Sequence, residues 1–212
     1  MIKNFVIFSY YDSKLKKIYS ENLRRFGFTP GGVFWNSKTS QYLRFDKLIK
    51  LIKQNKKKKK LRIADIGCGY GELLNFFKSN SVNNILYSGY DINPDLINYC
   101  KKRFPKNFFY VKNCPIEKCD FSVITGTYNF ATTNNIEKWE SYIIYNLEKC
   151  YRASSQGLIF NLQFSRESRI KNNIYYTNVD NMKNILSKKF KCVSSFFDKR
   201  MPNDVFFVVL KN

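Results

Sequence analysis

The chain has 212 residues, of which 44% are hydrophobic and 17% aromatic, which is enough apolar material for the core of one globular domain. Histidine is absent, and this excludes Ser-His-Asp and Cys-His catalysis, a histidine base and every histidine-containing metal site. No apolar run reaches the roughly 20 residues that span a bilayer, so we expect no membrane span, and we expect no bound metal.

Basic residues outnumber acidic ones, with 37 Lys and Arg against 16 Asp and Glu and a net charge of +21. Residues 1–60 hold 16 basic and 3 acidic residues, a net of +13, and the other 152 hold 21 and 13, a net of +8. A positive N-terminal third attracts anions, whether nucleic acid, acidic lipid or a small acidic substrate. The six cysteines lack CxxC spacing and the first residues lack a signal-peptide pattern, so we expect reduced thiols and a cytoplasmic protein.

Two amphipathic helices are predicted before residue 60. The first ends at Gly27, and its apolar face carries Leu15, Ile18, Tyr19, Leu23 and Phe26. The second begins near Ser37–Ser40, which are good capping residues, and its inner face carries Tyr42, Phe45, Leu48, Ile49 and Ile52. The five lysines at 56–60 are typical of a solvated linker.

Strands and helices alternate after residue 60, which is typical of an α/β fold with a mostly parallel sheet covered on both faces. The expected strands are Leu61–Ile66, Ile85–Asp91, Asn107–Lys112, Asp120–Thr125 and Gly157–Leu162. The expected helices are Glu72–Lys78, one capped by Asn93, Ile136–Arg152 and Val179–Lys189. Segments 192–198 and 205–210 form a C-terminal hairpin, and 166–178 reads as a long loop and a candidate lid.

The turn after the first strand carries the main chemical signal. It reads Asp65-Ile-Gly67-Cys68-Gly69-Tyr70-Gly71, and Asp91 closes the second strand 20 residues after the last glycine. Glycines let a ligand approach the main chain, and a carboxylate at the end of the second strand accepts hydrogen bonds from ribose hydroxyls. The spacing is not that of a dinucleotide fingerprint or a P-loop. An acid at Asp65 would repel a pyrophosphate and suits a cationic amine, so the pattern predicts a crevice that binds a nucleoside with such an amine.

At these residues the sequence resembles the class I S-adenosylmethionine-dependent methyltransferases, over residues 61–212. The resemblance rests on Asp65 with Gly67, Gly69 and Gly71, on Asp91, and on the hairpin at 192–210. It implies a Rossmann-like, doubly wound, mostly parallel seven-stranded sheet with an antiparallel C-terminal hairpin. A narrower resemblance, to small bacterial methyltransferases loosely labelled trans-aconitate-methyltransferase-like, rests on Phe34-Trp35, Ser37, Ser40-Gln41, Arg44-Phe45 and Ile174-Tyr175-Tyr176. It implies that residues 1–60 form a helical cap over the crevice.

The resemblance also implies a role for individual residues in binding S-adenosylmethionine. Asp65 would lie under the methionine amine, Asp91 would take the ribose hydroxyls and Arg44 would face the methionine carboxylate. The other implied cofactor-binding residues are Gly67, Cys68, Gly69, Gly71, Ile92, Asn113, Cys114, Thr125, Gly126, Trp35 and Gln41. The candidate substrate-binding residues are Tyr128, Asn129, Tyr175 and Tyr176. The alternative for some of these residues is that they only pack in the core or lie exposed to solvent. It applies to Trp35, Arg44, Tyr128, Asn129, Tyr175 and Tyr176.

No catalytic residue is assigned, because methyl transfer from a sulfonium needs mainly alignment and exclusion of water. Thr125-Gly-Thr-Tyr-Asn129 stands where amino-group methyltransferases carry Asp/Asn-Pro-Pro-Tyr, and Cys114-Pro115 reverses the Pro-Cys pair of cytosine C5 methylation. The favoured function is methylation of a small molecule, for which the basic N-terminal third allows an anionic character. The alternatives are an RNA or DNA methyltransferase and a non-catalytic cofactor-binding domain.

Overall fold

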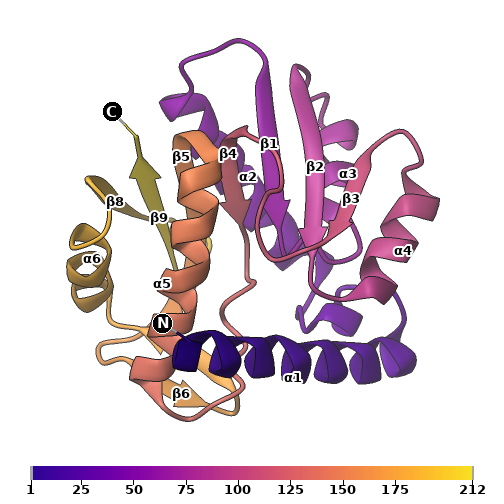
Figure 1. The fold of residues 1–212 in the computed structure, drawn as a ribbon. Coiled ribbons are helices and arrows are strands. Elements are labelled where there is room, and N and C mark those ends of the chain that lie inside the picture. Colours follow the sequence, from indigo (N-terminus) through magenta and orange to yellow (C-terminus); the bar gives the residue numbers. More distant parts are fainter. Residues whose placement is uncertain (1, 212) are drawn as a thin grey trace.

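The structure is a computed structural model that describes residues 2–211, with side chains described for residues 6–211. Its centre is a sheet (Figure 1) in which five strands run parallel in the order β3-β2-β1-β4-β5. These strands are β1 (Leu61–Ile66), β2 (Ile85–Asp91), β3 (Phe108–Val111), β4 (Cys119–Ile124) and β5 (Ser154–Phe164). Strand β9 (Asp204–Leu210) continues the sheet antiparallel to β5, and β8 (Cys192–Phe197) pairs with β9. The expected seven-stranded α/β sheet with a reversed C-terminal hairpin is therefore confirmed.

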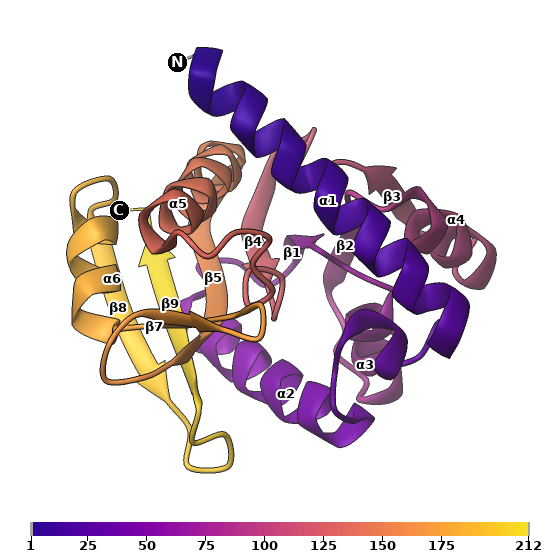
Figure 2. The same cartoon turned by 90° about the horizontal axis from the view of Figure 1, so that it is seen from below.

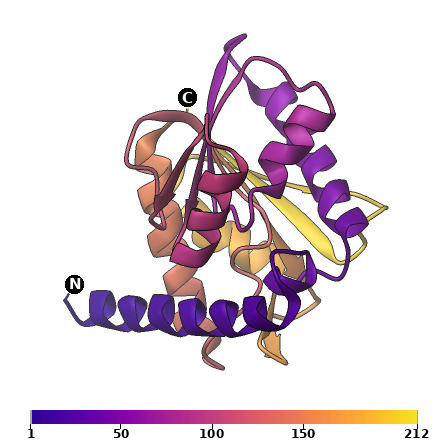
Figure 3. The ribbon, with the colours of Figure 1, turned by 90° about the vertical axis from the view of Figure 1, so that its right-hand side faces the viewer.

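Helices cover both faces of the sheet. Helices α2 (Lys38–Asn55), α3 (Glu72–Ser79) and α4 (Pro94–Arg103) pack on one face, and α5 (Ile136–Ala153) and α6 (Val179–Ser187) pack on the other. Figure 3 shows α5 on one side of the sheet and α2 with α3 on the other. Four of these helices begin at a side chain that accepts a backbone N–H, at Ser37, Asn93, Asn135 and Asn178.

Helix α1 (Ile2–Phe26) crosses beneath the carboxyl ends of the strands (Figures 1 and 2). Its buried face begins with Phe8 and Tyr11, whose rings lie 5.6 and 5.7 Å from that of Tyr142 on α5. Asp12 accepts hydrogen bonds from the Tyr142 hydroxyl and from Asn113 at the end of β3. The predicted apolar face was wrong at its end, because Phe26 is 57% exposed. The helix is thus tied to both α5 and the end of β3.

The segment expected to be a lid loop, 166–178, is instead a hairpin. Strand β6 (Arg169–Lys171) pairs antiparallel with β7 (Ile174–Thr177), and β7 joins the end of β5. Asn172 and Asn173 have φ of 52° and 61°, the left-handed conformation that a two-residue hairpin turn requires and that asparagine tolerates. The Asn-Asn pair was the missed signal. Within the described residues, no helix is long and apolar enough to cross a membrane.

Candidate active site

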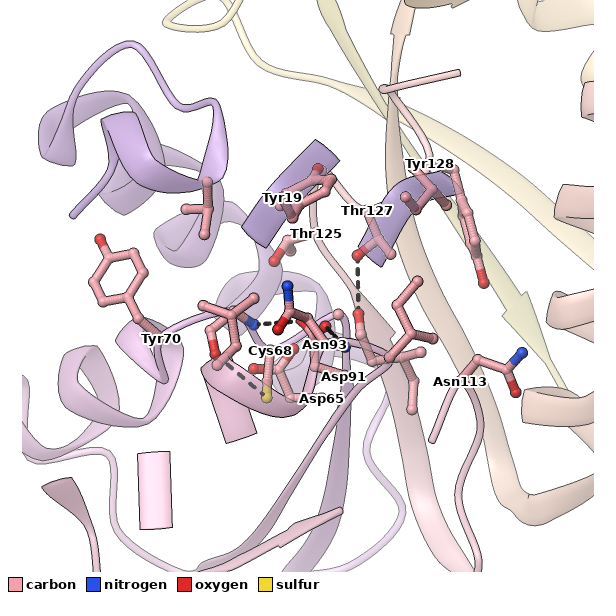
Figure 4. Close-up of a pocket in the computed structure, with 18 of the residues that line it drawn as sticks. Tyr19, Asp65, Cys68, Tyr70, Asp91, Asn93, Asn113, Thr125, Thr127 and Tyr128 are labelled. Atoms are coloured by element: carbon pink, nitrogen blue, oxygen red, sulfur yellow. Dashed lines mark hydrogen bonds between the residues drawn. The ribbon is translucent and has the colours of Figure 1, made fainter. Parts of the chain in front are cut away.

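A cavity lies at the carboxyl ends of β1, β2 and β4, beneath α1, and measures about 960 Å³ with its open mouth included. Asp65, Cys68 and Asp91 gather at one end of it, and Asn113 and Tyr128 lie toward the other (Figure 4). The predicted site residues in its lining are Asp65, Gly67, Cys68, Gly69, Asp91, Ile92, Asn113, Thr125, Gly126, Trp35, Gln41 and Tyr128.

The glycine turn after β1 forms one wall of the cavity. Gly67 and Gly69 have φ of 72° and 55°, which side chains with a Cβ rarely adopt. A Cβ on Gly67 would lie 2.3 Å from the hydroxyl of Thr127. Gly71 does not line the cavity, and a Cβ there would lie 2.8 Å from the ring of Phe104, the residue that follows α4. Gly67 and Gly69 therefore expose main chain to the cavity, whereas Gly71 allows α3 and α4 to pack closely.

Asp65, at the end of β1, is 2% exposed and carries an unsatisfied oxygen. Its Oδ2 accepts a hydrogen bond of 2.7 Å from the Tyr87 hydroxyl, while Oδ1 has no partner among the described residues. Burial raises the pKa of this carboxyl to about 7, with a contribution from the charge of Asp91 and against the effect of the Tyr87 hydrogen bond. A cationic amine beside Oδ1 would satisfy the free acceptor and stabilise the charged form.

Asp91, at the end of β2, ties the glycine turn to the second strand. Its Oδ2 accepts the Gly69 N–H at 3.0 Å and its Oδ1 accepts the Asn93 N–H at 2.8 Å. Burial raises the pKa of the Asp91 carboxyl to about 6. Each carboxylate oxygen has a second lone pair, so both can also accept hydrogen bonds from a ligand that offers adjacent hydroxyls.

The other end of the cavity lies between the ends of β2 and β3 and helix α5. Ile92, Asn113 and Tyr128 line it. Cys114 is not part of the lining and packs against the core on the α5 face, so its expected contact with a ligand is not supported. The Asn113 amide donates to Asp12 at 3.1 Å, which connects this end of the site to α1.

Trp35 and Gln41 close the cavity from the N-terminal segment. The indole of Trp35 lies so near Gly126 that a Cβ there would be 2.7 Å from the ring. Gln41 is 4% exposed and accepts the Tyr70 hydroxyl at 2.7 Å. Both residues line the cavity, and their contact with a cofactor stays a prediction.

Arg44 does not face the cavity, and this corrects the expected contact with a ligand carboxylate. Its guanidinium forms a bidentate ion pair with Asp204 on β9 and lies 4.9 Å from the Trp35 ring. Asp204 also accepts from Asn161, whose own oxygen accepts the Gly126 N–H at 2.9 Å. Arg44 thus supports the cavity wall through its neighbours.

Replacing Arg44 with methionine is expected to lower the free energy of unfolding by about 3 to 5 kcal/mol, because Asp204 would be left buried without its cation. Chemical denaturation measures this loss. The double variant Arg44→Met with Asp204→Asn is expected to recover a large part of it while keeping ligand affinity within about threefold. If the double variant regains stability but binds the ligand tenfold more weakly, Arg44 contacts the ligand after all.

Three of the four candidate substrate residues lie outside the cavity lining. The Asn129 side chain accepts the Gln163 N–H at 3.0 Å. Tyr175 is fully buried and donates to Glu140 at 2.6 Å, and the Tyr176 ring lies 5.1 Å from the guanidinium of Arg169. These residues stabilise the β6–β7 hairpin and its junction with β5, and Tyr128 alone of the four lines the cavity.

Sequence reasoning missed several lining residues, of which Tyr19, Thr127 and Asn146 bear most on the chemistry. Burial, with the charge of Asp91 adding to it, raises the pKa of the Tyr19 hydroxyl far above its ordinary value, so the phenol stays neutral near pH 7. Thr127 donates to the Ile66 carbonyl at 2.9 Å. Asn146 was recoverable, since it is the one amide on an otherwise apolar face of the predicted helix.

Comparison with known proteins identifies the family. The model of the methyltransferase domain family matches residues 57–205. Rv1506c of Mycobacterium tuberculosis, which is named as a methyltransferase, is 29% identical over 119 residues, covering 54% of this chain and 71% of that protein. The ubiquinone/menaquinone biosynthesis C-methyltransferase UbiE of Campylobacter jejuni is 26% identical over 119 residues, covering 53% of this chain and only 48% of UbiE.

Solved methyltransferase structures share the fold at low sequence identity. A SAM-dependent methyltransferase of Leishmania major superposes with a TM-score of 0.68 at 12% identity, covering 91% of this chain and 82% of that one. Magnesium protoporphyrin IX methyltransferase of Synechocystis, solved with bound SAM, gives 0.61 at 12% identity, covering 82% and 81%. With the matched domain and the acid-glycine turn, the chain belongs to the class I S-adenosylmethionine-dependent methyltransferases.

Proposed function

We propose that this methyltransferase transfers the methyl group of S-adenosylmethionine to a small molecule, by in-line displacement, within the cavity beneath α1. The supporting observation is that two carboxylates lie at one end of the cavity, which the N-terminal segment covers. One of them, Asp65, has an oxygen without a partner, and the other is Asp91. In this proposal residues 1–60 act as the cap and residues 61–212 as the cofactor-binding domain. A covered cavity suits an acceptor that can be enclosed.

The residues present fit the cofactor. Oδ1 of Asp65 is a buried acceptor without a partner, and it would hold the methionine ammonium. Asp91 would accept the ribose hydroxyls, and Ile92 with Asn113 would border the adenine. Gly67, Cys68 and Gly69 would run along the ligand with their main chain, and Thr125 and Gly126 would border the methionine end, near Trp35 and Gln41.

The reaction itself requires little of the protein beyond alignment. The bound cofactor supplies an activated methyl group with a neutral sulfide as leaving group. The chain orients the two reactants and excludes water, and α1 with Trp35 provides the enclosure. Tyr19 faces the cavity as a neutral phenol, which suits a hydrogen-bond donor and not a base.

Two lysines support an anionic acceptor. Lys16 on α1 and Lys112 after β3 both line the cavity, and they belong to a chain with a net charge of +21. Exposed cations increase the rate at which an anionic ligand associates with a cavity, and added salt reduces this effect. We also propose a cytoplasmic location, in keeping with the free thiols of Cys68, Cys100, Cys114, Cys119 and Cys150.

Radiolabel transfer tests the proposal. The purified protein is incubated with S-[methyl-³H]adenosylmethionine and a cell extract separated into small molecules, RNA and DNA. The proposal expects label in the small-molecule fraction, enriched among compounds retained on an anion exchanger. Label in RNA or DNA would replace it with a nucleic-acid methyltransferase, which the net charge would then explain.

Substituting Asp91 by alanine is expected to weaken binding of S-adenosylhomocysteine by at least one order of magnitude. Two charge-assisted hydrogen bonds to the ribose would be lost, at about 1.5 to 3 kcal/mol each, together with the tie to Gly69. Isothermal titration measures the dissociation constant, and Asp95→Ala, on the exposed side of α4, is the matched control. An unchanged dissociation constant for Asp91→Ala would refute its assigned role.

A further inference from the structure

Asn146 on α5 is a buried polar residue that no motif accounts for. Its side chain is 1% exposed and lines the cavity. Nδ2 donates to the Tyr142 carbonyl one turn earlier in the helix, at 3.1 Å. Oδ1 has no hydrogen-bond partner among the described residues. Leaving a buried acceptor unsatisfied costs about 1 to 3 kcal/mol, so a ligand group that donates to it would recover this cost.

Only four buried side-chain atoms in the described part of the chain lack a partner, and they are Asp65 Oδ1, Thr132 Oγ1, Asn146 Oδ1 and Gln156 Nε2. Of these residues, Asp65 and Asn146 line the cavity. Both free atoms are acceptors, and they lie on opposite faces of the sheet, with Asp65 bonded to Tyr87 and Asn146 on α5. The cavity therefore offers two separate buried acceptors to a ligand that spans the sheet edge.

S-Adenosylmethionine carries two amino groups at its two ends, the ammonium of the methionine and the 6-amino group of the adenine. We propose that Oδ1 of Asn146 accepts a hydrogen bond from the adenine 6-amino group and makes the site selective for adenine. This inference rests on the proposed placement of the cofactor, with the ammonium at Asp65. The inference assigns recognition of the adenine 6-amino group to Asn146, a residue outside the motifs identified in the sequence.

The orientation of the Asn146 amide gives the selectivity. Because Nδ2 is held by the Tyr142 carbonyl, Oδ1 is the atom left without a partner, and the amide cannot rotate without losing that bond. A purine with oxygen at position 6 would place an acceptor against this acceptor, and the mismatch leaves polar groups unpaired. Asn113 is less suited to the role, since its amide already bonds Asp12 and its side chain is only partly buried.

The test compares binding of S-adenosylhomocysteine with that of its 6-oxo counterpart, S-inosylhomocysteine, by isothermal titration. The wild-type protein is expected to prefer the 6-amino ligand by at least about tenfold. Asn146→Leu is expected to bind S-adenosylhomocysteine about tenfold more weakly and to lose most of the preference. Its cofactor-free melting temperature is expected not to fall, because the substitution removes an unsatisfied atom. Asn146→Asp keeps an acceptor and is expected to keep the preference.

Thr132→Val is the matched control, since it removes another buried unsatisfied atom that lies outside the cavity lining, and it is expected to leave the preference unchanged. If Asn146→Leu does not fold, Asn146→Ser draws the polar atom back toward the helix and is expected to lose the preference. A full preference in folded Asn146→Leu or Asn146→Ser, or a preference lost in Asn113→Ala instead, overturns the inference. A wild-type protein that binds neither ligand would instead overturn the proposed function.

Discussion

Replacing Asp65 with asparagine is expected to stabilise the cofactor-free protein above pH 7 and, at the same time, to weaken its binding of S-adenosylmethionine. In the folded protein burial raises the pKa of this carboxyl from 3.8 to about 7. At 1.36 kcal/mol per pKa unit, keeping it charged costs on the order of 4 kcal/mol. Asparagine avoids that cost, yet loses a charge-assisted hydrogen bond to the ammonium, which lowers affinity by about one to two orders of magnitude.

The pH dependence has a definite sign. Between about pH 4 and pH 7 the unfolded chain has released the Asp65 proton while the folded protein still holds it. The folded state therefore binds more protons, and the contribution of Asp65 to stability falls as the pH rises through this window and is constant above it. Melting temperatures of the wild-type protein and of Asp65→Asn, measured from pH 5 to 8, are expected to diverge with rising pH.

Binding of the cofactor should reverse this effect. An ammonium beside Asp65 favours the charged carboxylate, so its pKa falls and a proton is released on binding near pH 6. Titration calorimetry in two buffers of different ionisation enthalpy counts these protons, and Asp65→Asn is expected to release fewer. Asp91 also titrates near pH 6, but it is present in both proteins, so the difference isolates Asp65.

Asp120 provides the matched control. It too is 2% exposed, on β4. Burial acts to raise the pKa of Asp120, yet the Arg62 N–H, Lys58 and Ser155 outweigh it and hold the pKa below its ordinary value. Asp120→Asn is therefore expected to destabilise the protein and to leave cofactor affinity unchanged. Asp65→Asn with the same loss of stability would contradict the proposal that Asp65 holds a cation.

The sheet and the glycine turn were predictable because local sequence determines them. Strand β1 ends near Asp65 and is followed by alternating glycines, and the positive φ at Gly67 and Gly69 is a conformation that glycine readily adopts. Strand boundaries were correct to within a few residues for the same reason, since apolar runs of five or six residues define a buried parallel strand. The position of Asp91 at the end of β2 was predictable from its distance along the chain from the glycine turn.

Two of the errors concern residues whose partners are remote in sequence. Arg44 and Asp204 are 160 residues apart, and a net basic N-terminal segment gave no sign that this arginine was already neutralised. Tyr175 was expected in a loop, but pairing of β7 with β5 buries it completely. Such outcomes depend on which elements meet in the folded state, and one sequence without tertiary contacts does not specify them.

Substituting Gly67 by valine is expected to abolish measurable cofactor binding and to lower the free energy of unfolding by several kcal/mol. Gly67 has φ of 72°, and a β-branched residue with a positive φ is strained. In addition, a Cβ at this position would lie 2.3 Å from Oγ1 and 2.6 Å from Cγ2 of Thr127. Thr127 would have to move and lose its hydrogen bond to the Ile66 carbonyl.

Two further variants separate the causes of the Gly67→Val effect. Gly31→Ala is the control, because a Cβ on Gly31 has no neighbour closer than 3.8 Å, and its affinity and stability are expected to stay near wild type. In Gly67→Ala with Thr127→Ser the clash with Cγ2 is absent while the positive φ and the hydroxyl remain, so recovery is expected to be partial. Calorimetry and thermal melting measure both quantities. Wild-type affinity in Gly67→Val would mean that the main chain at this turn does not border the ligand, and the proposed placement of the cofactor would then be wrong.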